Sequence, residues 1–179
     1  MKSKLFIAAV AMLSLAISTQ ARAQSGIVGW VAVSAVCPVD SKSAAHKTSF
    51  GTVSFSGTAS GNINMTCIFD GTTRINPQDV NAFGLIFNND NGFVGGVNKC
   101  SISASFVGRS NSTGLLTLMG TFSTAGHSYS GFTTVDPIAI SPAIDFDRNT
   151  YVVTLNLHRI AGATCNPSVW VTFAEEIIP

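Results

Sequence analysis

The 179-residue chain has few charged residues, and this scarcity limits its partners. Only 11% of its residues are Asp, Glu, Lys or Arg, ten of them basic and nine acidic. A nucleic-acid-binding protein normally carries a basic patch, and the sequence shows no cluster of Lys and Arg. The scattered charges also form no polybasic segment for an anionic membrane surface. We therefore expect no nucleic-acid partner.

The sequence has one long apolar run, which is too short to span a membrane. Two lysines precede this run, Leu5–Ile17, and a small-x-small site ending at Ala23 follows it. A membrane helix needs about 20 apolar residues, whereas this order of segments is that of a cleaved secretory signal peptide. We predict a signal peptide over residues 1–23 and a single secreted or periplasmic domain over residues 24–179, with no membrane span.

No helical periodicity is visible after the signal segment, and strand-like alternation takes its place. In Asn62–Phe69, Lys99–Val107 and Tyr151–Arg159, apolar and polar side chains alternate. A period of two with one apolar face marks a strand in a half-buried antiparallel sheet. We expect further strands at Phe50–Ser56, Val80–Phe87, Leu115–Phe122 and Val169–Phe173. Weaker patterns predict two more, at Ile27–Val36 and Phe132–Ile140.

Turn-forming segments separate these strands, and the whole pattern predicts an all-β fold. Asn88–Gly92 and Asn111–Gly114 are rich in Asn and Gly, which tolerate turn conformations. We predict a disulfide-bonded antiparallel β-sandwich, jelly-roll or immunoglobulin-like, with about eight or nine strands. Val80–Phe87 is apolar on both faces, which predicts a central strand. Ser41–Lys47 is the most loop-like stretch, with a short helix as the alternative.

The exported part contains four cysteines without the spacing of a zinc site. Cys37, Cys67, Cys100 and Cys165 include no C-x-x-C pair and have no nearby His. An even number of cysteines in an exported chain predicts two disulfides. Cys67 and Cys100 both share a strand face with large apolar residues, which favours a Cys67–Cys100 bridge and leaves Cys37–Cys165. The other two connectivities stay open.

The segment Gly126–Gly131 is the motif most similar to a catalytic one. It approaches the G-x-S-x-G nucleophile elbow at Ser128, but Ser130 occupies the position of the last glycine. The elbow also needs a helix after the serine, and the residues that follow show no helical pattern. A polar loop is the simpler interpretation. We expect no enzyme, no catalytic residue and no cofactor, with a Ser128-dependent hydrolase as the weakest alternative.

Asp145 and Asp147 place two carboxylates on one side of an extended segment. Calcium takes oxygen ligands from such loops, whereas ordinary solvated turns have the same composition. The sequence favours a turn and no metal, and it leaves calcium binding open.

Trp170 is the candidate ligand contact. It alternates with Val169 and Val171 in its strand, so it is a candidate for an outward position. Carbohydrate-binding sandwiches present exposed Trp or Tyr rings as stacking surfaces. Two interpretations therefore remain for Trp170: a contact for a sugar or protein partner, or a side chain that packs beneath a loop or in a second core.

The order of segments resembles a recurrent type of small secreted bacterial protein with a β-sandwich fold. The segments that carry the resemblance are Asn64–Phe69, Val80–Phe87, Asn88–Gly92, Cys100–Ser103, Tyr151–Arg159 and Pro167–Phe173. The resemblance implies a β-sandwich and agrees with a Cys67–Cys100 bridge. It implies no activity.

Pilin subunits are a second comparison, because they are also exported, disulfide-bonded sandwiches rich in Thr, Ser and Gly. Gly51–Gly57 is similar to their first strand. This chain departs from them in its four cysteines, where pilins have two, and in lacking an aromatic C-terminal strand end. The leading hypothesis is therefore an exported non-catalytic binding or structural domain with a carbohydrate or protein partner. The alternative is a subunit of a pilus-like or other cell-surface assembly.

Overall fold

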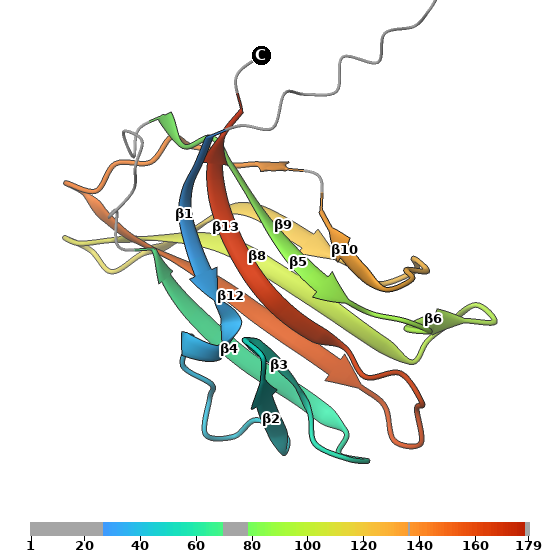
Figure 1. Ribbon diagram of the computed structural model, residues 1–179. Coiled ribbons are helices and arrows are strands. Elements are labelled where there is room, and N and C mark those ends of the chain that lie inside the picture. The colour runs from blue at the N-terminus through green and yellow to red at the C-terminus, as the bar shows by residue number, and fades with distance from the viewer. Residues whose placement is uncertain (1–26, 70–78, 136, 178–179) are drawn as a thin grey trace, which may run out of the picture.

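Two antiparallel β-sheets lie face to face in the computed structural model, which describes residues 27–69, 79–135 and 137–177 (Figure 1). The predicted signal peptide lies outside the described residues. The described elements are strands, apart from one 3-10 turn, η1 (Ser34–Val36). The predicted all-β sandwich is therefore confirmed. Within the described ranges, no helix is long and apolar enough to span a membrane.

The first sheet is centred on the C-terminal strand. Its seven strands are β1 (Ile27–Val33), β2 (His46–Ser49), β3 (Thr52–Phe55), β5 (Ala82–Asn88), β10 (Phe132–Thr134), β11 (Ile138–Ala139) and β13 (Ser168–Glu176). One side of β13 pairs with β5, and its other side pairs first with β3 and then with β1. Strands β10 and β11 pair with the far side of β5, and β2 pairs with β3. Strand β5 therefore has neighbours on both sides, as its doubly apolar sequence predicts.

The second sheet has the order β4-β12-β8-β9, and Figure 1 shows it behind the first. Its strands are β4 (Gly61–Phe69), β8 (Cys100–Ser110), β9 (Leu116–Ser123) and β12 (Asn149–Arg159). Burial alternates along β4, β8 and β12, because one face of each strand packs into the core and the other faces solvent. A separate small hairpin joins β6 (Phe93–Val94) to β7 (Val97–Asn98).

Aromatic side chains hold the two sheets together. Phe69 from the second sheet lies 5.2 Å from Trp30 of the first, measured between ring centroids, in an edge-to-face arrangement. Phe83 from the first sheet packs at 5.7 Å against Phe106 from the second. Such pairs contribute about 0.5–1.5 kcal/mol each beyond the burial of their apolar surface. The apolar core therefore fixes the two sheets as one packed sandwich.

The two predicted disulfides are present, but the favoured pairing is wrong. Cys37 is bonded to Cys67, and Cys100 to Cys165. Cys67 and Cys100 both point into the core as expected, yet their strands β4 and β8 flank β12 in one sheet. Two strand spacings of about 4.8 Å separate those strands, and a disulfide cannot form when Cα atoms lie more than about 7 Å apart.

The bridges that do form fasten irregular segments to the second sheet. Cys37 follows η1 and ties that segment to β4, and Cys165 lies before β13 and is tied to the start of β8. The loop-like stretch Ser41–Lys47 contains a turn closed by a Ser43 N–H bond to the Asp40 carbonyl. The chain then enters β2, which the sequence did not predict.

Candidate ligand-binding face

An open groove of about 560 Å³ lies on the outer face of the first sheet. We call it the aromatic groove. Its described lining residues are Lys47, Ser49, Phe50, Thr52, Ser54, Phe132, Asn166, Ser168 and Trp170. The lining combines three aromatic rings with hydroxyl and amide groups and one lysine. Concave sites that mix apolar surface with a few polar groups are typical of small-molecule binding.

Trp170 faces outward beside a break in the strand register. The pairing between β13 and β5 shifts between Val169 and Val171, so Trp170 is the extra residue of a β-bulge. On the other side of β13, Val169 pairs with Val53 of β3 and Val171 pairs with Val33 of β1. Bulges re-aim side chains and are common beside functional sites. The Trp170 side chain is 44% exposed and faces outward, while its indole also packs against the β2–β3 turn, so each interpretation of Trp170 holds in part.

Two neighbours hold the indole of Trp170 in the groove. Phe132, from β10, lies in an edge-to-face arrangement with ring centroids 6.3 Å apart, and its side chain is 59% exposed. On the other side, a Cβ atom added to Gly51 would lie 3.0 Å from Trp170 Nε1 and 2.9 Å from Val33 Cγ1. The indole therefore packs directly on the backbone of the β2–β3 turn, where only glycine leaves enough space.

Phe50 stands at the tip of the β2–β3 hairpin in an unfavourable backbone conformation. Ser49 pairs with Thr52, so Phe50 and Gly51 form a two-residue turn with φ angles of +48° and +80°. Such turns need positive φ at both central residues and usually contain Asn-Gly. A bulky residue with positive φ is a genuine outlier, and such strain is concentrated at functional sites. The Phe50 side chain is also 99% exposed, so it contributes almost nothing to the core.

A row of residues runs across the five strands beneath the groove. Successive cross-strand partners are Phe132, Asn88, Ser168, Ser54 and Lys47. Four strand spacings of about 4.8 Å give the row a length of roughly 19 Å. One end of the row is aromatic, the middle offers hydroxyl groups, and the other end carries a positive charge.

Ser128 lies on an exposed loop and lacks the partners that a nucleophile needs. Its hydroxyl donates a hydrogen bond to the Phe93 carbonyl at 3.1 Å. Asp90 anchors this loop, because its carboxylate accepts a bond from the Gly131 N–H. No histidine is hydrogen-bonded to Ser128 among the described residues, and the segment after it enters β10 and not a helix. The arrangement that the hydrolase alternative requires is not formed here.

The Asp145 carboxylate closes a turn. Its Oδ1 accepts hydrogen bonds from the backbone N–H groups of Asp147 at 3.0 Å and Arg148 at 3.2 Å. Its Oδ2 forms an ion pair with Arg148 Nε at 3.5 Å. The buried Tyr151 hydroxyl accepts the Asp145 N–H at 2.6 Å. These contacts engage both carboxylate oxygens of Asp145, which favours the turn interpretation. Within the described ranges, no group of three His, Cys, Asp or Glu side chains is placed to hold a metal.

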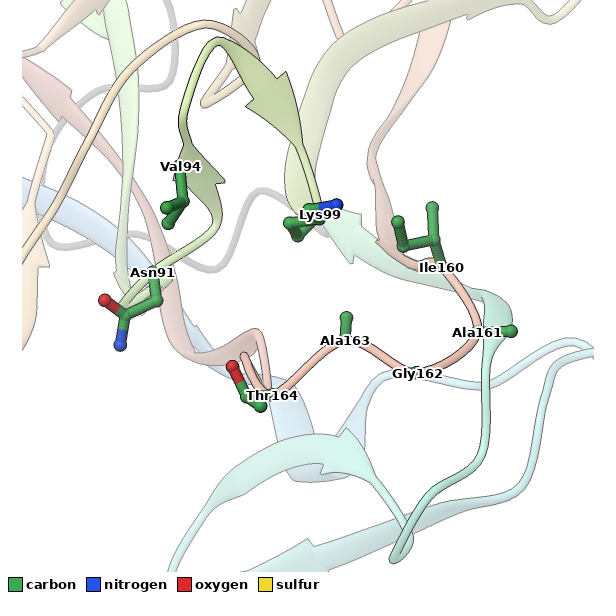
Figure 2. Close-up of a pocket in the computed structure, with 8 residues that line it drawn as sticks. All are labelled: Asn91, Val94, Lys99, Ile160, Ala161, Gly162, Ala163 and Thr164. Atoms are coloured by element: carbon green, nitrogen blue, oxygen red, sulfur yellow. The ribbon is translucent and has the colours of Figure 1, made fainter.

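A second hollow of about 200 Å³ lies between the β6–β7 hairpin and the loop after β12 (Figure 2). Figure 2 shows Val94 and Lys99 on the hairpin side and Ile160 and Thr164 at the ends of the opposite loop. Small residues make up most of that loop, and Lys99 is the charged group among the described lining residues. This hollow offers far fewer functional groups than the aromatic groove.

No protein-family model and no curated protein matches the chain. Among solved structures, it is similar in fold to carbohydrate-binding modules from the β-sandwich superfamily described for their promiscuous specificity, with 7% identity and a TM-score of 0.40. That match covers 83% of this chain and 54% of the other, so this chain spans about half its length. Another solved structure of similar fold is the CBM36-1 domain of a multidomain xylanase from the hindgut metagenome of Trinervitermes trinervoides. It shows 10% identity and a TM-score of 0.37 over 82% of this chain and 95% of that domain.

Similarity at this level transfers no function, so the groove is interpreted from its own residues. Of its three aromatic residues, only Trp170 is identifiable as a candidate from the sequence. The Phe50-Gly51 dipeptide next to an alternating segment is the signal that could have revealed the hairpin tip. Nothing local marks Phe132, because only the pairing of β10 with β5 brings it near Trp170.

Proposed function

We propose that the chain is an exported, non-catalytic domain that binds carbohydrate in the aromatic groove. The observation that carries the proposal is the pair of exposed rings, Trp170 and Phe132, at 6.3 Å in a groove otherwise rich in hydroxyl and amide groups. Aromatic rings cover the apolar faces of sugars, while neighbouring hydroxyl and amide groups bond to sugar hydroxyls. The groove supplies both kinds of group on one surface.

The construction of the groove supports a binding role. A contiguous exposed apolar surface normally marks an interaction site. The bulge at Trp170 and its close packing on Gly51 fix the indole before a ligand arrives. Such pre-organisation reduces the entropy lost on binding. The two disulfides suit an oxidising compartment, which supports a secreted or periplasmic location.

A glycan-array screen of the purified protein, followed by titration of each hit, tests this function. We expect Trp170→Ala to weaken binding about tenfold or more, because a central aromatic contact contributes about 1.4 kcal/mol or more. Ile68→Ala is the matched control, since Ile68 is an exposed apolar residue on the other sheet. Full affinity in Trp170→Ala, or the absence of glycan binding across a broad array, would contradict the proposal.

A second candidate function is that of a subunit in an assembly, and strand β9 favours it. This strand is one edge of the second sheet and contains no charged residue. Leu116 and Leu118 are 70% and 61% exposed on it. Natural proteins usually protect such edges with charges or cover them. The opposite edge, β4, is covered in this way, because Asp40 and Pro38 bond to its backbone, whereas β9 is covered only in part, by a bond from the Ser141 N–H to the Met119 carbonyl.

The partner in this second function would be another copy of the chain. Antiparallel pairing of two β9 strands would be self-complementary under two-fold symmetry. Sedimentation velocity at increasing protein concentration should then show a dimer, and Leu118→Lys should remove it. A wild-type protein that stays monomeric at high concentration would exclude this function and leave carbohydrate binding untouched.

A further inference from the structure

The β2–β3 hairpin gives the aromatic groove an asymmetric charge. Lys47 is the charged residue among the described groove-lining residues, and they include no carboxylate. Among the described residues, the ion pair is between Arg148 and Asp145. Lys47 therefore has no carboxylate partner within that part of the chain. An ammonium group without a counter-charge attracts anions over about 8 Å at physiological salt.

Register places the Lys47 charge at the end of a binding surface. Lys47 lies opposite Ser54, which lies opposite Ser168, and the row continues to the aromatic end at Phe132. A ligand that lies along the row and stacks at the aromatic end would bring a distant part of itself to the lysine. The roughly 19 Å length of the row suits an oligosaccharide better than a single sugar.

Phe50 belongs to the same hairpin and adopts a backbone conformation that is unfavourable for phenylalanine. Its φ of +48° would suit Asn, and its side chain is almost fully exposed. Neither turn geometry nor core packing explains a phenylalanine at this position. A contact with a ligand that also reaches Lys47 explains it, because Phe50 and Lys47 both line the groove at the hairpin.

From these observations, we propose that the groove binds an anionic glycan, with Lys47 contacting its carboxylate or sulfate group and Phe50 covering a sugar ring beside it. This inference rests on the proposed carbohydrate-binding function and adds the class of ligand. A lysine on an edge strand also discourages pairing with other chains. Because edge protection by Lys47 would not depend on the ligand, the test has to measure how strongly the protein prefers anionic over neutral glycans.

The test compares three probes at low salt: polygalacturonate, dextran sulfate and neutral dextran. We expect wild-type protein to bind an anionic probe at least tenfold more tightly than the neutral one, with a preference that weakens as salt is added. Lys47→Gln should reduce that preference at least fivefold. Lys42→Gln, which removes the same charge from an exposed turn outside the groove, should leave it unchanged.

The choice between the two anionic probes separates carboxylate from sulfate as the recognised group. Equal binding of neutral and anionic probes, or equal loss in the Lys47 and Lys42 variants, would overturn the anionic ligand class. If Trp170→Ala still abolished binding in that case, the proposed carbohydrate function would stand without it.

Phe50→Asn tests the contribution of the hairpin tip. Because Asn fits the turn better than Phe, we expect a higher midpoint of urea unfolding together with at least fivefold weaker binding of the anionic probe. Weaker binding by a more stable protein cannot result from unfolding. Unchanged affinity in this variant would remove Phe50 from the ligand contact.

Discussion

The indole of Trp170 rests on the backbone of Gly51, with room for a hydrogen atom but not for a methyl group. A Cβ atom at Gly51 would lie 3.0 Å from Trp170 Nε1, and φ at Gly51 is +80°. This contact joins a turn at the sheet edge to an aromatic residue of the central strand. The geometry of the groove therefore depends on a residue that itself offers no side chain to a ligand.

The first prediction uses this contact. Gly51→Ala should displace the Trp170 indole and so weaken glycan binding. It should also lower the free energy of unfolding by about 1–2 kcal/mol, because alanine is unfavourable at positive φ. Gly57→Ala is the matched control, because Gly57 has φ of +51° but open space around its missing Cβ. Titration and urea unfolding should show both variants destabilised and only Gly51→Ala impaired in binding. Equal affinities would mean that Gly51 does not position Trp170.

The second prediction concerns Arg159, whose buried guanidinium joins two loops. Its Nη1 donates to the Gly57 carbonyl and its Nη2 to the Ala163 carbonyl, both at 2.8 Å. Arg159→Met should lower the free energy of unfolding by about 2–3 kcal/mol, because two hydrogen bonds from a charged group are lost. The exposed Arg109→Met should change it by less than about 0.5 kcal/mol in the same urea titration. Similar effects would contradict the structural role of Arg159.

The third prediction tests the hydroxyl of Tyr151. This group accepts the Asp145 N–H at 2.6 Å and donates to the Asp145 carbonyl at 3.2 Å. Tyr151→Phe keeps the buried ring and removes these bonds, so it should cost about 1–2 kcal/mol in the free energy of unfolding. The comparison variant is Tyr129→Phe, which should cost less. A Tyr151→Phe protein as stable as wild type would show that the Asp145 turn holds without the hydroxyl.

The fourth prediction is a pH dependence of stability. Burial of Glu175 raises the pKa of its carboxyl above the ordinary value of 4.5. Between the ordinary and the raised pKa, the folded state binds more protons than the unfolded state, so stability falls as pH rises through that window. Glu175→Gln should remove this part of the slope when urea unfolding is measured from about pH 4 to pH 8. A slope unchanged in the variant would assign the pH dependence to other groups.

Strands with one buried face were predictable from the sequence. In β4, β8 and β12 the side-chain period is two, and each strand packs one face on the core, so local composition specifies both the strand and its orientation. The inward position of Cys67 follows from the same alternation. Strand β2 was missed because all four of its residues are exposed, which leaves no alternation to detect.

The candidate site was only partly predictable. Trp170 could be identified because its alternation with neighbouring valines is local. Phe132 and Lys47 belong to the same surface only because β10, β5, β13, β3 and β2 are neighbours in one sheet. Strand order depends on pairings between segments far apart in the chain, and no short sequence window contains that information.

By itself, the sequence determined that this chain forms an all-β sandwich with two disulfides, because strand alternation and an even number of cysteines are properties of the chain itself. Only the tertiary structure decided which cysteines pair and which aromatic residues share a groove. Both outcomes depend on distances across strands. The separation of β4 and β8 by β12 excludes the Cys67–Cys100 bridge, and the pairing of β10 with β5 brings Phe132 next to Trp170.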